Sequence, residues 1–331
     1  MTVLGSSAPP VVVLGVSRSG TTLLKEMLDR SSELAIPSES YFIPQLWDRH
    51  GERSSVEALT EDLGRIVRVR EWGVTPADVR ARVGGDARFR DVIDAVYRTY
   101  AERRGKSRYG DKTPAYMQRL PLLDAVFPDA QYVHIVRDGR DAGLSFMAMK
   151  RRPRFNAGRP RRLAEFACAW RLEIEDARRF GGRLGTGRYR EVRYEDLVVE
   201  PEARLREICA FLGLGYERAM LEYHRDVDAS QLADHPRLAQ PPGAGRSRWQ
   251  ADMASADVEL FEAIAGGMLS NFRYERTHPS PSQAARRRAA RELVAYRARL
   301  SSWNVALRAA RRSPVWRLRQ VYIRRTQPGV E

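Results

Sequence analysis

The stretch VVVLGVSRSGTT, residues 11–22, joins an apolar run to a glycine-bearing turn and two threonines. Val11–Leu14 has the continuous apolar character of a strand buried inside a parallel sheet. Residues 15–21 predict a turn, and residues 22–30 predict a helix with leucines on one face. A strand that leads through such a turn into a helix points backbone N–H groups and the positive helix end at an anion. The stretch therefore predicts an α/β fold with an anion site after its first strand.

Gly15, Gly20 and Thr22 stand at the spacing of a nucleotide-binding P-loop. Such a loop carries a lysine directly after its second glycine, and that lysine reaches the β- and γ-phosphates. This chain has Thr21 there, and the cation within the loop is Arg18. Three interpretations compete: a surface turn, a P-loop without its lysine, and a phosphate cradle for a different donor. Close backbone approach at Gly20 and the threonine hydroxyls favour the cradle.

Strand and helix patterns alternate along the rest of the chain. QYVHIVRD (131–138) predicts a second buried strand followed by a helix, and RYREVRYEDL predicts a third strand from Arg188. A shorter strand ends at GDKTP (110–114), and helical patterns fill about 54–104. This alternation implies a central parallel sheet with helices on both faces, the three-layer arrangement of P-loop NTPase-like folds.

A second anion-binding pair follows the strand at 131–138. Arg137 stands at the end of that strand, and Ser145 comes eight residues later on the next helix. The carboxyl ends of parallel strands share the edge where open α/β folds bind their ligands. A planar guanidinium suits a terminal phosphate. The alternative is a surface arginine–aspartate pair at the start of a helix.

Together these motifs resemble the sulfotransferases that use 3′-phosphoadenosine 5′-phosphosulfate (PAPS), in particular the bacterial carbohydrate and tyrosylprotein enzymes. The 5′-phosphosulfate loop of that family reads roughly P-[KR]-S-G-T-T-x-[LW]; this chain has SRSGTTLL, with Ser17 where proline is usual. Arg137 and Ser145 match the family's 3′-phosphate pair. Segments similar to those of bacterial members also occur in order: GDKTP (110–114), RYEDL (193–197) and GRSRW (245–249). The resemblance covers about residues 11–276.

The resemblance implies that PAPS is the co-substrate, that 3′,5′-adenosine bisphosphate is the product, and that no metal takes part. Arg18 would contact the oxygen between phosphate and sulfate and stabilise the charge that builds there. Lys112 would lie near the sulfuryl oxygens, unless it is a solvated turn lysine, and Tyr194 would meet the adenine, unless it is a core aromatic. The residues implied to bind the donor are Ser17, Arg18, Ser19, Gly20, Thr21, Thr22, Arg137, Ser145, Tyr194 and one of Arg246 and Arg248.

The general base is expected in IPSESYFIP, which follows the first helix and contains Glu39. A hydroxyl acceptor must lose its proton as the sulfuryl group arrives. In tyrosylprotein sulfotransferases and several bacterial carbohydrate enzymes the corresponding segment carries the catalytic glutamate, and the offset from Arg18 is the same as in the tyrosylprotein enzymes. Tyr41 stands where those enzymes have an arginine for the peptide acceptor, so protein tyrosine is in doubt as the acceptor. The alternative for Glu39 is an acid near a helix N-terminus.

The formal net charge of +15 is concentrated in one part of the chain. Residues 282–325 hold thirteen arginines and one acid, Glu292, so the remainder is close to neutral. This distribution argues against a nucleic-acid-binding body. We expect a sulfotransferase domain over 1–279, with the helical insertion at about 54–104, and a basic amphipathic extension over 280–331. The extension is expected to pack on the body or a second subunit, to lie on anionic lipid, or to remain solvated.

The expected function is transfer of a sulfuryl group to a hydroxyl of a carbohydrate, glycolipid or small metabolite, with catalytic residues Glu39, Arg18 and Lys112. The alternatives are a P-loop kinase and a non-catalytic nucleotide-binding or membrane-adaptor protein. The two cysteines stand in separate helical patterns, and the first residues have no signal-peptide pattern, so a cytoplasmic location is the default expectation. No histidine or cysteine cluster has metal-ligand spacing.

Overall fold

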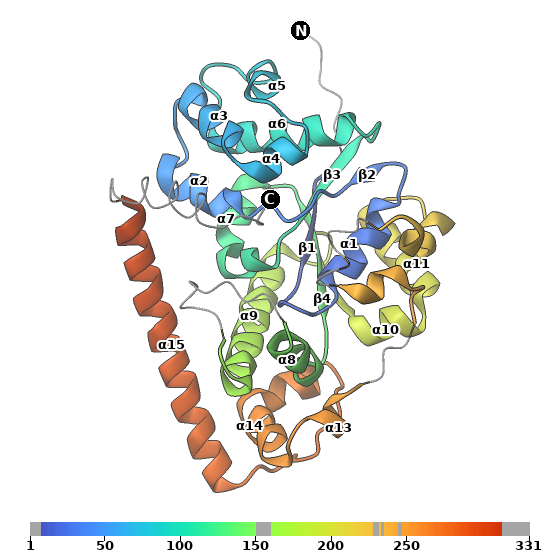
Figure 1. Cartoon of the computed structure of the whole chain (residues 1–331), viewed down its shortest axis with the longest axis vertical. Coiled ribbons are helices and arrows are strands. Elements are labelled where there is room, and N and C mark those ends of the chain that lie inside the picture. The colour runs from blue at the N-terminus through green and yellow to red at the C-terminus, as the bar shows by residue number, and fades with distance from the viewer. Residues whose placement is uncertain (1–7, 150–159, 228–231, 233–234, 244–246, 313–331) are drawn as a thin grey trace.

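The computed structural model describes residues 8–149, 160–227, 232, 235–243 and 247–312 (Figure 1). Its centre is a five-stranded, all-parallel sheet in the order β2-β3-β1-β4-β5. The strands are β1 (Val11–Leu14), β2 (Leu34–Ala35), β3 (Arg108–Lys112), β4 (Gln131–Val136) and β5 (Tyr189–Arg193). The predicted parallel α/β fold is confirmed. The two-residue strand β2 was not predicted.

The apolar run of β1 follows from its position at the centre of the sheet, between β3 and β4. Val11 and Val13 face one hydrophobic cluster, and Val12 and Leu14 face the other. Because successive strand residues point to opposite faces, a strand covered on both sides needs apolar residues at every position. Val12 lies in register with Asp111 and Tyr132, which aligns the carboxyl ends of the three strands.

Helices cover both faces of the sheet (Figure 1). One face carries α1 (Thr21–Asp29), α10 (Tyr194–Val199), α11 (Pro201–Leu212) and the 3₁₀ segment η2 (Arg218–Asp226). The other carries α6 (Phe89–Glu102), η1 (Pro114–Arg119), α7 (Leu120–Val126), α8 (Gly139–Met147), α9 (Leu163–Leu184) and α14 (Ser255–Asn271). The remaining elements are α2 (Phe42–His50), α3 (Val56–Gly64), α4 (Val67–Glu71), α5 (Pro76–Arg80), η3 (Pro236–Ala239), α13 (Trp249–Asp252) and α15 (Gln283–Arg312).

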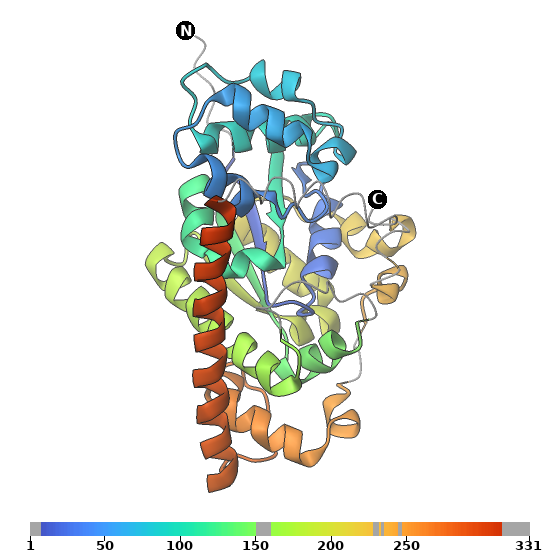
Figure 2. The same cartoon turned by 60° about the vertical axis from the view of Figure 1, so that its left-hand side comes forward.

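The basic helix α15 runs along one side of the molecule and contacts α14, α9 and α2 (Figure 2). Tyr296 is buried, and Leu293 and Leu300 pack against the same core, so the first part of the predicted apolar stripe faces the body. Glu292 pairs with Arg162 on α9's N-terminal side. The side chains of Trp303 and Leu307, and the apolar residues predicted after residue 314, lie outside the described residues.

Candidate active site

The turn after β1 has the geometry of an anion-binding loop. Gly20 has φ +96° and Arg18 has φ +72°, and α1 begins at Thr21. A Cβ on Gly20 would lie 2.4 Å from Cδ2 of the Tyr194 ring, so the ring packs on the loop only because residue 20 is glycine. The loop thus leads directly into the N-terminus of α1, which is the positive end of the helix.

Hydroxyl groups of this loop are buried at the same place. Ser19 is 1% exposed, and its Oγ has no hydrogen-bond partner within the described part of the chain. A buried hydroxyl without a partner costs about 1–3 kcal/mol. Thr21 and Thr22 are buried beside it, whereas Ser17 is half-buried. A phosphate oxygen would supply the missing partner of Ser19.

The two predicted anion motifs meet through Arg18. Its Nε donates to Oγ of Ser145 on α8 at 3.0 Å, and Arg137 Nη1 at the end of β4 donates to the Arg18 carbonyl at 3.2 Å. The Arg137 guanidinium lies 4.8 Å from the centre of the Tyr194 ring. We call residues 17–22 together with Arg137 and Ser145 the donor cradle.

The predicted catalytic pair lies next to the cradle. Lys112 Nζ, at the end of β3, donates to Glu39 Oε1 at 2.6 Å and to Thr22 Oγ1 at 3.2 Å. Tyr41 donates to the other oxygen of the Glu39 carboxylate. The Lys112 side chain is only 5% exposed, whereas Glu39 is 24% exposed. Glu39, Tyr41 and Lys112 form what we call the acceptor edge, where a partly open carboxylate adjoins a buried cation.

A buried polar network supports the acceptor edge from behind. Asp111, the residue before Lys112, accepts hydrogen bonds from Tyr97 (2.6 Å) and from Ser40 (2.9 Å), the residue after Glu39. Ser40 also contacts the Tyr116 hydroxyl at 2.6 Å. Burial raises the pKa of Asp111 to about 6, although its hydrogen bonds act in the opposite direction. The Asp111 carboxyl group therefore ties Ser40, the residue after Glu39, to the strand residue that precedes Lys112.

His235 is a site residue that the sequence did not predict. Its Nδ1 lies 3.2 Å from Arg18 Nη1, and its Nε2 lies 3.4 Å from Thr22 Oγ1. It stands directly before Pro236, the first residue of η3. Two residues separate it from the buried Leu238. A histidine before a proline matches no sequence motif, so only the three-dimensional structure shows that His235 contacts the loop.

One of Arg246 and Arg248 was expected to bind the donor, and the structure describes only Arg248. Arg246 lies outside the described residues. The Arg248 side chain is 66% exposed and forms an ion pair with Asp252 at 2.5 Å. Its backbone N–H donates to Asp141, one turn before Ser145 on α8. The segment is thus anchored near the cradle, while the Arg248 guanidinium is engaged with Asp252.

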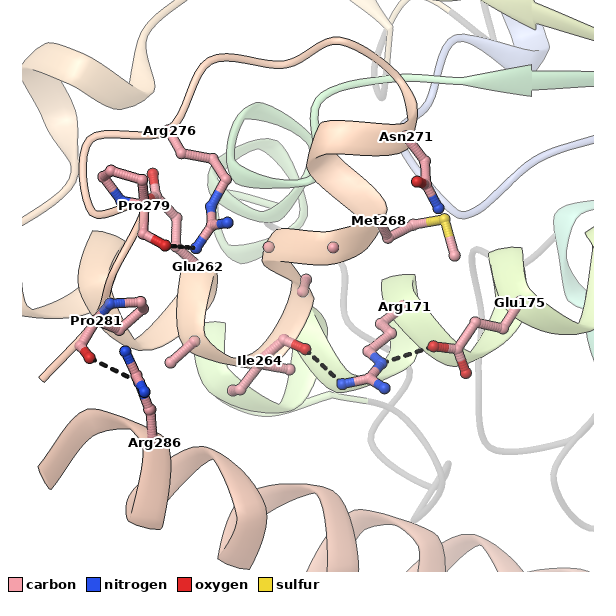
Figure 3. Close-up of a pocket in the computed structure, with 14 residues that line it drawn as sticks. Arg171, Glu175, Glu262, Ile264, Met268, Asn271, Arg276, Pro279, Pro281 and Arg286 are labelled. Atoms are coloured by element: carbon pink, nitrogen blue, oxygen red, sulfur yellow. Dashed lines mark hydrogen bonds and ion pairs between the residues drawn. The ribbon is translucent and has the colours of Figure 1, made fainter. Parts of the chain in front are cut away.

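A pocket of about 500 Å³ lies apart from these residues, between α9, α14 and the start of α15 (Figure 3). Arg171 there donates to Glu175 and to the Ile264 carbonyl, and Arg286 donates to the Pro281 carbonyl. Arg171 thus joins α9 to α14, and Arg286 contacts the segment just before α15. Within the described residues, no group of three or more histidine, cysteine, aspartate or glutamate side chains has the arrangement of a metal site.

Comparison with known proteins gives the family. The chain belongs to the sulfotransferase family, whose model matches residues 9–218. The resemblance seen in the motifs is therefore confirmed as membership of this family.

Several relatives show how far the similarity extends. Protein-tyrosine sulfotransferase A of Caenorhabditis elegans is 26% identical over 231 residues, 68% of this chain and 56% of that protein. Nodulation protein NoeE of Sinorhizobium fredii is 26% identical over 296 residues, 80% of this chain and 66% of that protein. The chain thus spans between about half and two thirds of these two proteins.

Solved structures share the fold. The sulfotransferase domain of the Synechococcus PCC 7002 olefin synthase has a TM-score of 0.59 at 24% identity, covering 82% of this chain and 97% of that domain. The sulfotransferase domain from the curacin biosynthetic pathway has a TM-score of 0.58 at 19% identity, covering 82% and 100%.

Proposed function

We propose that this protein transfers the sulfuryl group of PAPS to a hydroxyl group of an acceptor. The observation that carries the proposal is the junction at Thr22, where the donor cradle and the acceptor edge meet. Lys112 contacts both Thr22 and Glu39, so a cation bridges the anion site and a carboxylate. Positioned charge beside a positioned base is the arrangement that group transfer to a hydroxyl requires.

The cradle residues fit the anionic part of the donor. Ser19 offers an unpartnered hydroxyl, the start of α1 offers backbone N–H groups, and Arg18 offers a guanidinium. Arg137 and Ser145 would hold the terminal 3′-phosphate. Tyr194 packs on Gly20 and lies under the Arg137 guanidinium. It offers an aromatic ring to the adenine of the donor. Arg246 is favoured over Arg248 as the further clamp residue, because Arg248 is paired with Asp252.

In this mechanism the chain moves one proton and stabilises one leaving group. Bound PAPS supplies a sulfuryl group on a good leaving phosphate. Glu39 accepts the acceptor's hydroxyl proton on a carboxylate oxygen, each of which retains lone-pair capacity beyond the bonds from Lys112 and Tyr41. Lys112 and Arg18 stabilise negative charge on the transferred and departing oxygens. No metal ion is required for these roles.

The acceptor is proposed to be a hydroxyl of a carbohydrate, glycolipid or small metabolite. Tyr41 is 44% exposed beside Glu39 and presents an aromatic ring and a hydroxyl rather than a cation. An acidic peptide would be better served by an arginine at this position. Relatives include NoeE and an omega-hydroxy-β-dihydromenaquinone-9 sulfotransferase of Mycobacterium bovis as well as protein-tyrosine sulfotransferases, so the family match leaves the acceptor open.

A transfer assay tests the proposal against its alternatives. The protein is incubated with sulfate-labelled PAPS, or with γ-labelled ATP and Mg²⁺, and a panel of hydroxylated sugars, lipids and metabolites. Label should move from PAPS and not from ATP. Transfer from ATP would establish the kinase alternative. Failure to bind either nucleotide would favour the non-catalytic adaptor.

We further propose a cytoplasmic protein that contacts anionic membranes through the outer face of α15. Cys168 and Cys209 are free and buried, which suits a reducing compartment. Among the described residues no helix is long and apolar enough to cross a membrane. The exposed side of α15 carries Arg287 and Arg288, with Val294 69% exposed nearby. Such a mixture suits an interfacial helix.

Vesicle binding tests the membrane contact. Arg287→Glu with Arg288→Glu should weaken binding to phosphatidylglycerol-containing vesicles by about tenfold or more, because each basic residue contributes about 1 kcal/mol near such a surface. The matched control is Arg68→Glu with Arg70→Glu, which reverses the charge of two exposed residues on α4. Equal binding by both double variants would contradict the proposal. Dimerisation lost only in the α15 variant would instead identify this face as a contact between two copies.

A further inference from the structure

His235 enters the donor cradle from a distant part of the chain. Its Nδ1 contacts Arg18 at 3.2 Å and its Nε2 contacts Thr22 at 3.4 Å, across 217 and 213 residues of sequence. The chain on its C-terminal side is fixed: Leu238 is buried, and the Gln240 carbonyl accepts a hydrogen bond from Tyr223 at 2.8 Å. The imidazole therefore contacts two of the cradle side chains that are proposed to meet the donor's anion.

Two described contacts of His235 bear on its protonation state. A guanidinium only donates hydrogen bonds, so Nδ1 must accept the bond from Arg18 and carries no proton. The neutral ring then carries its proton on Nε2, which faces the Thr22 hydroxyl oxygen. Thr22 Oγ1 also accepts from Lys112 Nζ, which has no acceptor capacity. The structure assigns one tautomer of a neutral imidazole.

Three cations lie at or near the ring among the described residues. Arg18 is in direct contact, Lys112 shares the Thr22 hydroxyl, and Arg137 donates to the Arg18 carbonyl. Among the described residues of this group Glu39 is an acid, and Lys112 contacts both Glu39 and Thr22. A proton on Nδ1 would point at the guanidinium and break the contact. A phosphate or sulfate oxygen would reverse this preference, because it accepts from both cations.

We propose that His235 caps the donor cradle in the free protein, and that donor binding is coupled to uptake of one proton by this histidine. The incoming oxyanion replaces Nδ1 as the acceptor of the Arg18 hydrogen bond. His235 then takes a proton from solvent on Nδ1 and donates to the same anion as an imidazolium. The proposal rests on the proposed function, in which the cradle holds the phosphosulfate group of PAPS.

Calorimetry with 3′,5′-adenosine bisphosphate tests the coupling without turnover. Binding is measured at pH 7.5 in buffers of different ionisation enthalpy, for the wild type, His235→Gln and His224→Gln. His224 lies in η2 close in sequence to the same segment and serves as the matched control. Relative to His235→Gln, the wild type and His224→Gln should take up about half a proton or more. Their affinity should also rise relative to His235→Gln as pH falls, by at most about tenfold per pH unit.

A direct measurement on the wild type guards against a variant that folds poorly. Nitrogen NMR of the labelled histidine should show an unprotonated Nδ1 in the free protein and protonation of that atom after the nucleotide is added. Binding of the nucleotide without proton uptake that depends on His235 would overturn this inference and leave the proposed function intact. Failure of the wild type to bind the nucleotide at any pH would overturn both.

Discussion

The donor cradle and the acceptor edge meet at Thr22 and Lys112, but they are built from different kinds of contact. The cradle is built around a local backbone turn, which the side chains of Arg137 and Ser145 join: Gly20 and Arg18 adopt positive φ, and α1 starts immediately afterwards. The acceptor edge is assembled from side chains on separate segments, held by Ser40 and Asp111 behind it. Binding by a backbone turn should be lost when the conformation of the turn changes. The function of a site made of side chains should instead be lost when a single polar group is removed. Variants should therefore separate donor binding from turnover.

The largest effect is expected at Glu39, because it would carry the transferred proton. Glu39→Gln should lower kcat by about 10²- to 10⁴-fold. Affinity for 3′,5′-adenosine bisphosphate should change little, since the cradle contacts do not include this side chain. Steady-state kinetics and calorimetry on the same preparation check both halves. Tyr41→Phe is the control, because it removes one hydrogen bond to Glu39 and leaves the carboxylate. Full activity of Glu39→Gln would place the base elsewhere.

Arg137→Ala should mainly weaken nucleotide binding and should affect turnover less. A hydrogen bond to a charged group contributes about 1.5–3 kcal/mol, so nucleotide affinity should fall by about 10- to 100-fold. The rate at saturating donor should fall less. Arg248→Ala is the matched arginine variant, and its pairing with Asp252 predicts a much smaller loss of affinity. If Arg248→Ala weakens binding as much as Arg137→Ala, the clamp is arranged differently from our proposal.

Gly20→Ala tests whether the cradle depends on its backbone. Alanine at φ +96° is strained, and its Cβ would collide with the Tyr194 ring. Gly213→Ala is a close control, because Gly213 has φ +69° at the end of α11 and open space around it. Both variants should lose about 1 kcal/mol or more of unfolding free energy. Nucleotide binding should be lost only in Gly20→Ala; parallel losses in both would show a global effect.

Asp111→Asn probes the support of the acceptor edge through pH. The pKa of Asp111 is raised by burial to about 6, above its ordinary value of 3.8. The contribution of the protonated carboxyl to stability is therefore complete below about pH 4 and is lost as pH rises through about 6. The difference in unfolding free energy between wild type and variant should shift by about 2–3 kcal/mol across this window. Denaturant titrations at several pH values measure it, and a constant difference would contradict the assignment.

Much of the sheet and the cradle could be predicted because their signals are continuous in sequence. The apolar run Val11–Leu14 is central and covered on both faces, so every position is constrained. The spacing of Arg137 and Ser145 indicated an anion site, and the structure brings both to Arg18. By contrast, Leu34–Ala35 is too short to show a period of two, and β2 was missed.

Contacts made by distant single residues could not be predicted in the same way. His235 reaches the cradle across more than two hundred residues and stands in a stretch without periodicity. The Asp111 network joins Tyr97, Ser40 and Tyr116 from three other segments. In each case the position of the side chain depends on tertiary packing rather than on its neighbours in sequence.

Calorimetric titration with 3′,5′-adenosine bisphosphate, compared with ATP and Mg²⁺, tests the central claim most directly. The cradle has Arg18 inside the loop and threonine, not lysine, at position 21. Arg137 and Ser145 both contact Arg18. We therefore expect the bisphosphate to bind without metal and at least about tenfold more tightly than ATP with Mg²⁺, a difference of about 1.4 kcal/mol. Tighter binding of ATP with Mg²⁺, or no binding of the bisphosphate, would contradict a PAPS-dependent sulfotransferase.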